Sequence, residues 1–224
     1  MWRSRTSLPA AGIRYCTAVG RSADRRSAGF GRGKPLGGST IFTIGHSTRP
    51  LADFVALLHQ AGVTLLADVR AFPRSRTTPQ FNGDTLAVAL AAEGIGYRHL
   101  RALGGRRHHR KGTPPSLNTY WRVAAFRNYA DYAETDEFRA GLDHLRELAR
   151  DHRCAIMCAE AVWWRCHRRI ITDYLLAGGT PVEHIMGPGQ VIAATLTPGA
   201  IISSDGTLRY PAEDSIGHSS DVAG

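Results

Sequence analysis

The sequence has no long hydrophobic run and only four cysteines in 224 residues. No stretch approaches the roughly eighteen apolar residues that a membrane-spanning helix needs, so we expect no membrane span. The first residues also lack the continuous apolar core of a secretory signal. Without such a signal, the cysteines are expected to be reduced thiols rather than a disulfide framework. They are Cys16, Cys154, Cys158 and Cys166.

Acidic residues are scarce in the first forty positions, which hold eight Lys or Arg but a single acid, Asp24. This segment carries most of the formal charge of +9, because the rest of the chain holds 20 basic and 18 acidic residues. Residues 1–39 are rich in Arg, Ser and Gly and show no apolar period, so we predict a disordered basic leader. Three roles stay open: an organelle transit peptide, a non-structural extension, or a tail that binds nucleic acid electrostatically.

Beyond the leader, residues 40–187 alternate short apolar runs with amphipathic segments. The runs "TIFTIGHS", "VTLLADVR", "IGYRHL", "CAIMCAE" and "PVEHIM" predict buried strands. Helical spacing between them predicts helices at 49–62, 84–94, 119–133, 135–152 and 166–179, the fourth with Thr135 as its N-cap. This order predicts an α/β fold: a single domain with a mostly parallel sheet flanked by helices on both faces, a Rossmann-like layering. For residues 188–224 we predict an extension with a hairpin around Asp205 and Gly206, then a polar tail.

Polar and glycine residues follow the predicted strands at one edge of this sheet. Ligands of parallel sheets bind beyond the carboxyl ends of the strands, so side chains there are candidates for a site. The candidates, in strand order, are His46; Asp68, Arg70, Arg74 and Ser75; Gly104 and Gly105; Cys158 and Glu160; and, at the start of the following helix, Cys166, His167 and Arg168.

The same residues resemble a known family. The run "TIGHS", then "DVR" with "PRS", "LGG", "CAE" with "CHR", and "VEHI" is similar to the domain of unknown function 488 family of bacterial and archaeal proteins, over roughly Thr40 to Met186. The resemblance implies a compact α/β domain and a cytoplasmic location. It implies no reaction. The leader and the segment after Gly187 depart from the family pattern, so nothing about them follows from it.

The stretch "CAEAVWWRCHRR" suggests acid–base chemistry. Glu160 ends a buried strand, and His167 lies in the first turn of the next helix, level with Glu160 and with His46. We therefore expect Glu160, His167 and His46 to transfer protons. The competing interpretation is that His167 is a core histidine and that Glu160 only orients an imidazole.

Arginines at this edge suggest an anionic ligand. Arg70, Arg74 and Arg168 are predicted to hold a phosphate or carboxylate group, because a guanidinium can meet two oxygens at once. Ser75, Asp68, Gly104 and Gly105 complete the predicted substrate-binding set. The alternative is that Arg70 braces the fold by pairing with Asp68 or Glu160.

The cysteines suggest two further hypotheses. Cys166 lies at a helix start next to His167, which favours a nucleophilic thiolate. Our main hypothesis includes no metal, because neighbours on a helix point about 100° apart and Cys166 and His167 would not share one ion. A metal held by Cys158, Cys166 and His46 remains the alternative. The sequence does not indicate which cofactor, if any, is bound.

The preferred hypothesis is therefore an enzyme that acts on an anionic, phosphate-bearing substrate such as a nucleotide or nucleic acid. The tryptophans Trp163 and Trp164 and the basic loop 106–111 favour that partner class, since indoles stack on bases. The competing hypotheses are a binding module without turnover, and thiol- or metal-dependent chemistry at Cys166.

Overall fold

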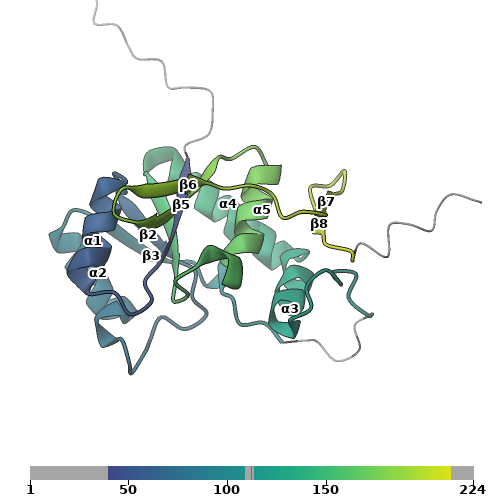
Figure 1. Cartoon of the computed structure of the whole chain (residues 1–224), viewed down its shortest axis with the longest axis horizontal. Helices are drawn as coiled ribbons and strands as arrows, with labels where there is room; N and C mark the ends of the chain where they lie inside the picture. Colours follow the sequence, from purple (N-terminus) through teal and green to yellow (C-terminus); the bar gives the residue numbers. More distant parts are fainter. Residues whose placement is uncertain (1–39, 109–111, 113, 213–224) are drawn as a thin grey trace, which may run out of the picture. The chain divides into compact units, whose positions relative to one another are not determined.

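The strands form a six-stranded sheet in the order β3-β2-β4-β1-β5-β6 (Figure 1). In this computed structural model, residues 40–108, 112 and 114–212 are described. The predicted basic leader, part of the basic loop and the polar tail lie outside them. The strands of the sheet are β1 (Ile41–Gly45), β2 (Leu65–Asp68), β3 (Gly96–His99), β4 (Cys154–Cys158), β5 (Val182–Gly187) and β6 (Gln190–Ala193).

All neighbours in the sheet are parallel except the edge pair β5 and β6. The helices are α1 (Leu51–Gln60), α2 (Gly83–Ala92), α3 (Ala124–Ala133), α4 (Asp136–Asp151) and α5 (Arg168–Ala177), with short 3-10 turns η1 (Pro79–Phe81), η2 (Arg101–Leu103) and η3 (Trp163–Arg165). The predicted α/β class with a mostly parallel sheet is confirmed.

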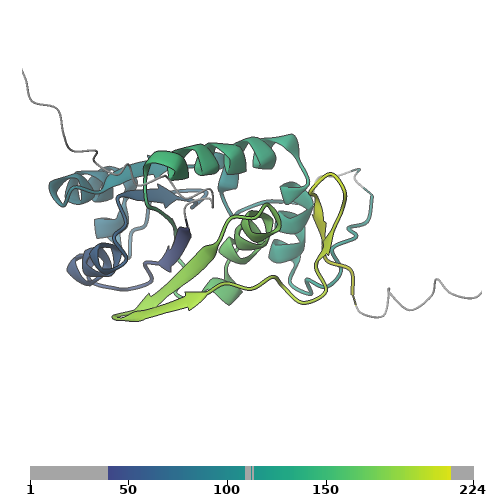
Figure 2. The same cartoon turned by 90° about the horizontal axis from the view of Figure 1, so that it is seen from above.

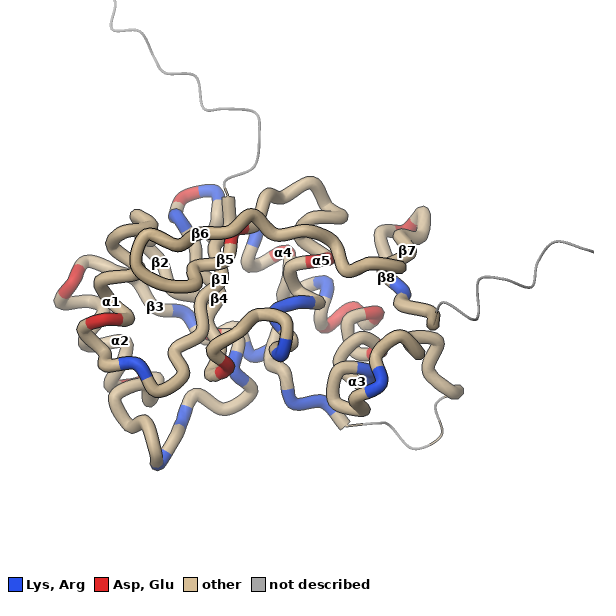
Figure 3. Tube along the Cα trace, viewed as in Figure 1, with Lys and Arg blue, Asp and Glu red and all other residues tan. Residues whose placement is uncertain are grey.

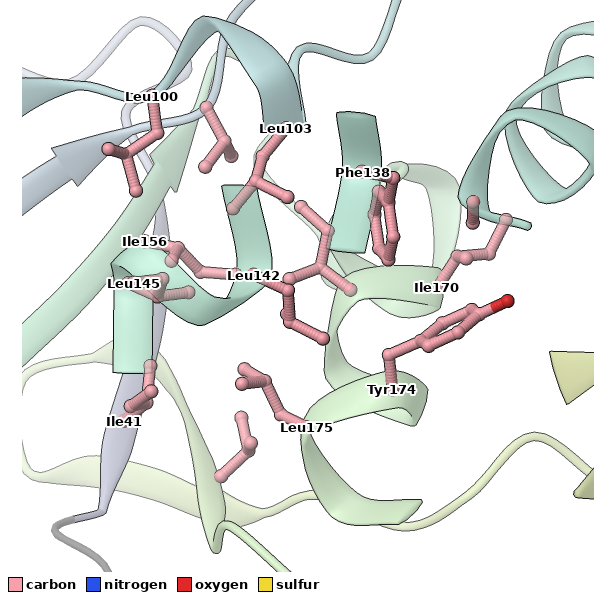
Figure 4. Close-up of a cluster of buried hydrophobic side chains, with 14 of the residues drawn as sticks. Ile41, Leu100, Leu103, Phe138, Leu142, Leu145, Ile156, Ile170, Tyr174 and Leu175 are labelled. Atoms are coloured by element: carbon pink, nitrogen blue, oxygen red, sulfur yellow. The ribbon is translucent and has the colours of Figure 1, made fainter. Parts of the chain in front are cut away.

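Two apolar clusters show which helices cover which face. On one face, Phe42 and Met157 pack with buried residues of α1 and α2. On the other face, β1 and β4 pack against α4 and α5. Figure 4 shows this second cluster, with Leu142 and Leu145 of α4 and Leu175 of α5 among its labelled side chains. The central strands are apolar on both faces because helices cover both sides, so the layering is the predicted one.

The starts of two helices and the presence of one strand are the main differences from the sequence prediction. Helix α3 begins at Ala124 rather than at residue 119, because Tyr120 donates its backbone N–H to the carbonyl of Tyr210 at 2.9 Å. Helix α5 begins at Arg168, and Cys166 before it is extended. Strand β6 was not predicted. Its four residues are all exposed, so it lacks the apolar pattern of a buried strand.

The segment after β6 packs onto the helices through one buried carboxylate. Figure 2 shows β5 and β6 side by side, with the chain continuing to the antiparallel pair β7 (Ile201–Ile202) and β8 (Leu208–Arg209). Asp173 of α5 accepts hydrogen bonds from the N–H of Thr197 (2.9 Å) and the hydroxyl of Tyr210 (3.0 Å). No helix among the described residues is long and apolar enough to cross a membrane.

The N-cap of α4 gives a first prediction. Thr135 has extended backbone angles, and its hydroxyl accepts the N–H of Phe138, as predicted. Thr135→Ala should lower the free energy of unfolding by about 1 kcal/mol, because one helix-end donor loses its acceptor. Urea unfolding would measure the loss, with Thr135→Ser as the control that keeps the hydroxyl. Equal stability of the Ala and Ser variants would contradict the capping role.

Candidate functional site

Three neighbouring strands, β2, β4 and β1, bring distant parts of the chain together at their carboxyl ends. Cys158 ends the middle strand β4 and lies in register with Gly45 of β1. Beyond the strands, His46 and Ser47 donate their backbone N–H groups to the carbonyls of Cys158 and Ala159, at 3.0 and 2.9 Å. The segment after β1 is thereby joined to the segment after β4.

A pocket of about 610 Å³ opens at this edge of the sheet. Four arginines and one carboxylate, Glu160, contribute to its lining. In Figure 3 the loops on this side of the sheet are mostly basic where they are charged. The predicted residues that line the pocket are His46, Arg70, Arg74, Ser75, Gly105, Cys158, Glu160, Cys166 and His167.

Arg70 forms a buried ion pair with Asp68. The guanidinium donates to both oxygens of the Asp68 carboxylate, at 2.5 to 3.0 Å, and to the carbonyl of Phe81 at 2.7 Å. Tyr97 donates its hydroxyl to the same carboxylate at 2.8 Å. Burial disfavours the charge on Arg70, yet the bonds to Asp68 outweigh it and raise the pKa of Arg70 above its usual value. The bracing role is the one that the geometry favours for this arginine.

His46 continues this network in a neutral state. Its Nδ1 lies 2.8 Å from the carbonyl of Ser47, so it carries the proton, and its Nε2 lies 3.3 Å from Nη1 of Arg70, which donates. The ring stacks on Phe81 with centroids 4.3 Å apart. Burial, and then the charge of Arg70, lowers the pKa of His46. Both ring nitrogens are thus engaged within the protein, which favours a positioning role.

The two cysteines lie in contact below the pocket. The sulfur atoms of Cys158 and Cys166 are 2.9 Å apart, and the Cys166 sulfur is also 3.5 Å from Nδ1 of His167. Their hydrogen bond, with burial, raises the pKa of Cys158 well above its usual range. Burial opposes ionisation of Cys166 as well, but the bond from Cys158 and the charges of His167 and Arg168 outweigh it, so its pKa lies well below the usual range. Of the two cysteines, Cys166 is therefore the one whose surroundings favour the thiolate form.

His167 is fixed by a backbone carbonyl on β2's connecting segment. Its Nε2 lies 2.8 Å from the oxygen of Val69, which can only accept, so Nε2 carries a proton. Nδ1, the other ring nitrogen, faces the sulfur of Cys166 at 3.5 Å. Gly105 packs against this ring so closely that an added Cβ would lie 2.3 Å from Nδ1. The role of Gly105 is thus to leave room for His167.

Arg168 turns away from the pocket. Its side chain is 1 % exposed, and it donates to the sulfur of Cys166 (3.3 Å), the hydroxyl of Thr43 (3.5 Å) and the carbonyl of Glu160 (2.7 Å). It is not among the residues that line the pocket. The prediction that Arg168 holds substrate does not fit this placement, because the guanidinium has no free face toward the ligand.

The remaining predicted residues lie at the rim or behind it. Arg74 is largely exposed and 3.4 Å from the equally exposed Asp84. The hydroxyl of Ser75 accepts the N–H of Thr78 at 3.2 Å and so shapes the loop after β2. Gly104 is buried, and a Cβ there would lie 2.9 Å from Ala71, which assigns it to packing. The carboxylate of Glu160 is exposed at the pocket.

Sequence reasoning left several pocket residues out of the candidate set. Arg106 and Arg165 line the pocket, and so does Phe72, which is 67 % exposed. Arg165 stands inside "CAEAVWWRCHRR", so its position in that stretch was the available signal. The tryptophans do not line the pocket. Trp163 instead stacks on His184, with ring centroids 4.4 Å apart.

The donor atoms of Cys158, Cys166 and His167 lie within 4.8 Å of one another. The sequence-based argument against a shared ion assumed that Cys166 and His167 lie on a regular helix. Cys166 is extended and His167 is the N-cap of α5, so the 100° separation does not apply. Among the described residues, His167 rather than His46 completes this donor group.

A family model described as a domain of unknown function, DUF488, matches residues 50–175. The chain belongs to this family. No curated protein and no solved structure matches the chain. The matched region of this DUF488 protein contains Asp68, Arg70, Cys158 and Cys166, whereas His46 precedes it.

The buried side chain of His184 should make this DUF488 protein less stable in acid. Nδ1 of His184 bonds to the hydroxyl of Thr43 at 2.8 Å, and Nε2 has no hydrogen-bond partner among the described residues. Burial, and then the charge of Arg168, lowers the pKa of His184 from 6.5 to about 4. Because the folded pKa lies below the unfolded one, this contribution to stability is complete above about pH 6.5 and is lost as the pH falls toward 4.

Urea unfolding at a series of pH values would measure this loss. The free energy of unfolding should fall less steeply below neutrality in His184→Asn than in the unchanged protein, because Asn does not titrate there. Parallel curves for the two proteins would refute the assignment to His184.

Proposed function

We propose that this DUF488 protein is an enzyme that acts on a phosphate-bearing substrate, a nucleotide or nucleic acid, in the pocket at the carboxyl ends of β1, β2 and β4. One observation carries the proposal: a reactive cluster of two cysteines and a histidine lies at the pocket, and exposed arginines surround it. Such a combination pairs attraction for an anion with groups that can act on it.

The pocket arginines divide into two kinds, and one kind supports an anionic ligand. Arg70 is neutralised by Asp68, as described above. Arg106 and Arg165 form no ion pair with a described acidic side chain, and both are exposed. Their guanidinium groups keep donors for an incoming phosphate. The exposed ring of Phe72 beside them suits a base or another flat group.

Glu160 is the residue that we assign to proton transfer. It is the only carboxylate among the described residues that line the pocket, and its backbone is held on both sides. The N–H of Glu160 donates to the sulfur of Cys158 at 3.4 Å, and its carbonyl accepts from Arg168 at 2.7 Å. A fixed backbone beside the thiol–imidazole cluster suits a general base or acid. His46 supports the site by positioning Arg70.

Binding of phosphate ligands tests the anion site. The double variant Arg106→Ala/Arg165→Ala should weaken binding of AMP by about tenfold or more, since one charge-assisted hydrogen bond contributes about 1.5 kcal/mol or more. Isothermal titration calorimetry at fixed ionic strength would measure the affinity. Arg150→Ala, at an exposed position of α4, is the matched control. Unchanged affinity in the double variant, or an equal loss in the control, would refute the site.

Turnover separates an enzyme from a binding module. In Glu160→Gln, the kcat for hydrolysis of a chromogenic phosphodiester such as bis(p-nitrophenyl) phosphate should fall by about 10² to 10⁴, the usual contribution of a general acid or base. The affinity for AMP should stay unchanged. Glu147→Gln, exposed on α4, controls for the loss of one negative charge. No turnover in the unchanged protein, together with binding of AMP, would favour the module without catalysis.

A further inference from the structure

We propose that Cys158, Cys166 and His167 bind a thiophilic metal ion, Zn²⁺ by preference, with one coordination position open to the pocket. This deepens the proposed function by naming the reactive centre of the same site. The binding of metal can nevertheless be measured without any activity. Two thiolates and one imidazole with a fourth position left to water or substrate form a donor set known from catalytic zinc sites.

The backbone brings these donors together from two segments. Cys158 is the last residue of the central strand β4, and Cys166 follows the turn η3 in extended conformation. His167 comes next and is the N-cap of α5. All three side chains border the pocket, and their donor atoms lie within 4.8 Å of one another. Zinc–sulfur bonds of about 2.3 Å in a tetrahedron require sulfur atoms about 3.8 Å apart, so the two sulfur atoms, 2.9 Å apart without an ion, would have to separate to bind one.

The hydrogen bond made by Nε2 of His167 suits this histidine to bind a metal through Nδ1. Histidines that bind metals nearly always donate their other N–H to a carboxylate, a carbonyl or water, which fixes the ring. Nε2 of His167 makes that bond to the carbonyl of Val69 at 2.8 Å. Gly105 leaves the Nδ1 side uncrowded, because a Cβ there would overlap the ring. The imidazole is thus held in the tautomer and orientation that coordination needs.

Each sulfur also receives a backbone N–H from the residue two positions later. Glu160 donates to Cys158 at 3.4 Å, and Arg168 donates to Cys166 at 3.5 Å. Nε of Arg168 is a second donor to Cys166, at 3.3 Å. Donors of this kind stabilise negative sulfur. Binding of a metal would release the remaining thiol proton, and the divalent cation would offset the repulsion between the two thiolates.

The donor types favour zinc over the alkaline-earth ions. Thiolate and imidazole ligands suit Zn²⁺, Cu⁺ and Fe²⁺, whereas Mg²⁺ and Ca²⁺ prefer oxygen. When bound, zinc would supply a Lewis acid at the pocket. The chain's own residues then have separate tasks: Arg106 and Arg165 bind the anion, and Glu160 exchanges the proton.

Elemental analysis of the full chain, purified without an affinity tag and reconstituted with zinc under reducing conditions, tests the proposal. We expect about one zinc per chain in the unchanged protein and a loss of at least tenfold in Cys158→Ser, Cys166→Ser and His167→Ala. Cys154→Ser is the matched control, because Cys154 is a buried cysteine of the same strand outside the donor group. Absence of zinc from the reconstituted protein, or its retention in the three variants, would overturn the proposal.

Cobalt substitution gives a second measurement that needs no variant to fold. The unchanged chain loaded with Co²⁺ should show thiolate-to-cobalt charge-transfer absorption in the near ultraviolet. If that absorption is missing, the proposal is wrong. A measurement of AMP binding distinguishes the failure of this proposal from the failure of the proposed function. If the protein binds AMP but no metal, only the zinc centre is refuted. If it binds the metal but not AMP, the proposed substrate class is refuted.

Discussion

The buried guanidinium of Arg168 is the constraint on which the site depends. Among the described residues it is the largest fully buried side chain, and none of their carboxylates lies within ion-pair distance of it. An uncompensated buried charge costs several kcal/mol. The groups that face Arg168 are the carbonyl of Glu160, the hydroxyl of Thr43 and the sulfur of Cys166, of which only the sulfur can carry a negative charge. The fold therefore favours an anionic Cys166.

This requirement links the stability of the domain to its chemistry. One arginine side chain joins β1, the segment after β4 and the start of α5, so the three parts are held at fixed distances. Arg70 fixes the end of β2 in the same way, because its guanidinium bonds to Asp68 and also to His46. Two internal arginines thus hold the pocket together, while those at the rim stay exposed. A basic pocket can be stable without its ligand when its inner charges are compensated by the protein.

Strand ends could be predicted from the sequence, but side-chain directions could not. The runs "DVR", "CAE" and "GHS" predicted one edge of one sheet, because ligands and polar residues gather beyond the carboxyl ends of parallel strands. Nothing in that pattern says that Arg168 points inward. Its direction depends on Thr43, 125 residues away in sequence. Local backbone conformation could not be predicted either. On a regular helix the side chains of Cys166 and His167 would point apart, but Cys166 is extended and His167 is the N-cap of α5, so their donor atoms lie together.

The neighbours of the cysteines explain why this edge of the sheet is suited to a reactive centre. Cys154 lies on the same strand, and burial alone raises its pKa to about 12. Cys158 and Cys166 are also buried, yet each sulfur accepts a backbone N–H, and Cys166 has an imidazole and a guanidinium beside it as well. Burial alone makes a thiol inert, whereas burial combined with directed donors and an opposite charge makes a thiolate that solvent does not screen. The difference between Cys154 and Cys166 is therefore one of neighbours, and those neighbours come from the edge of the sheet that also carries the exposed arginines.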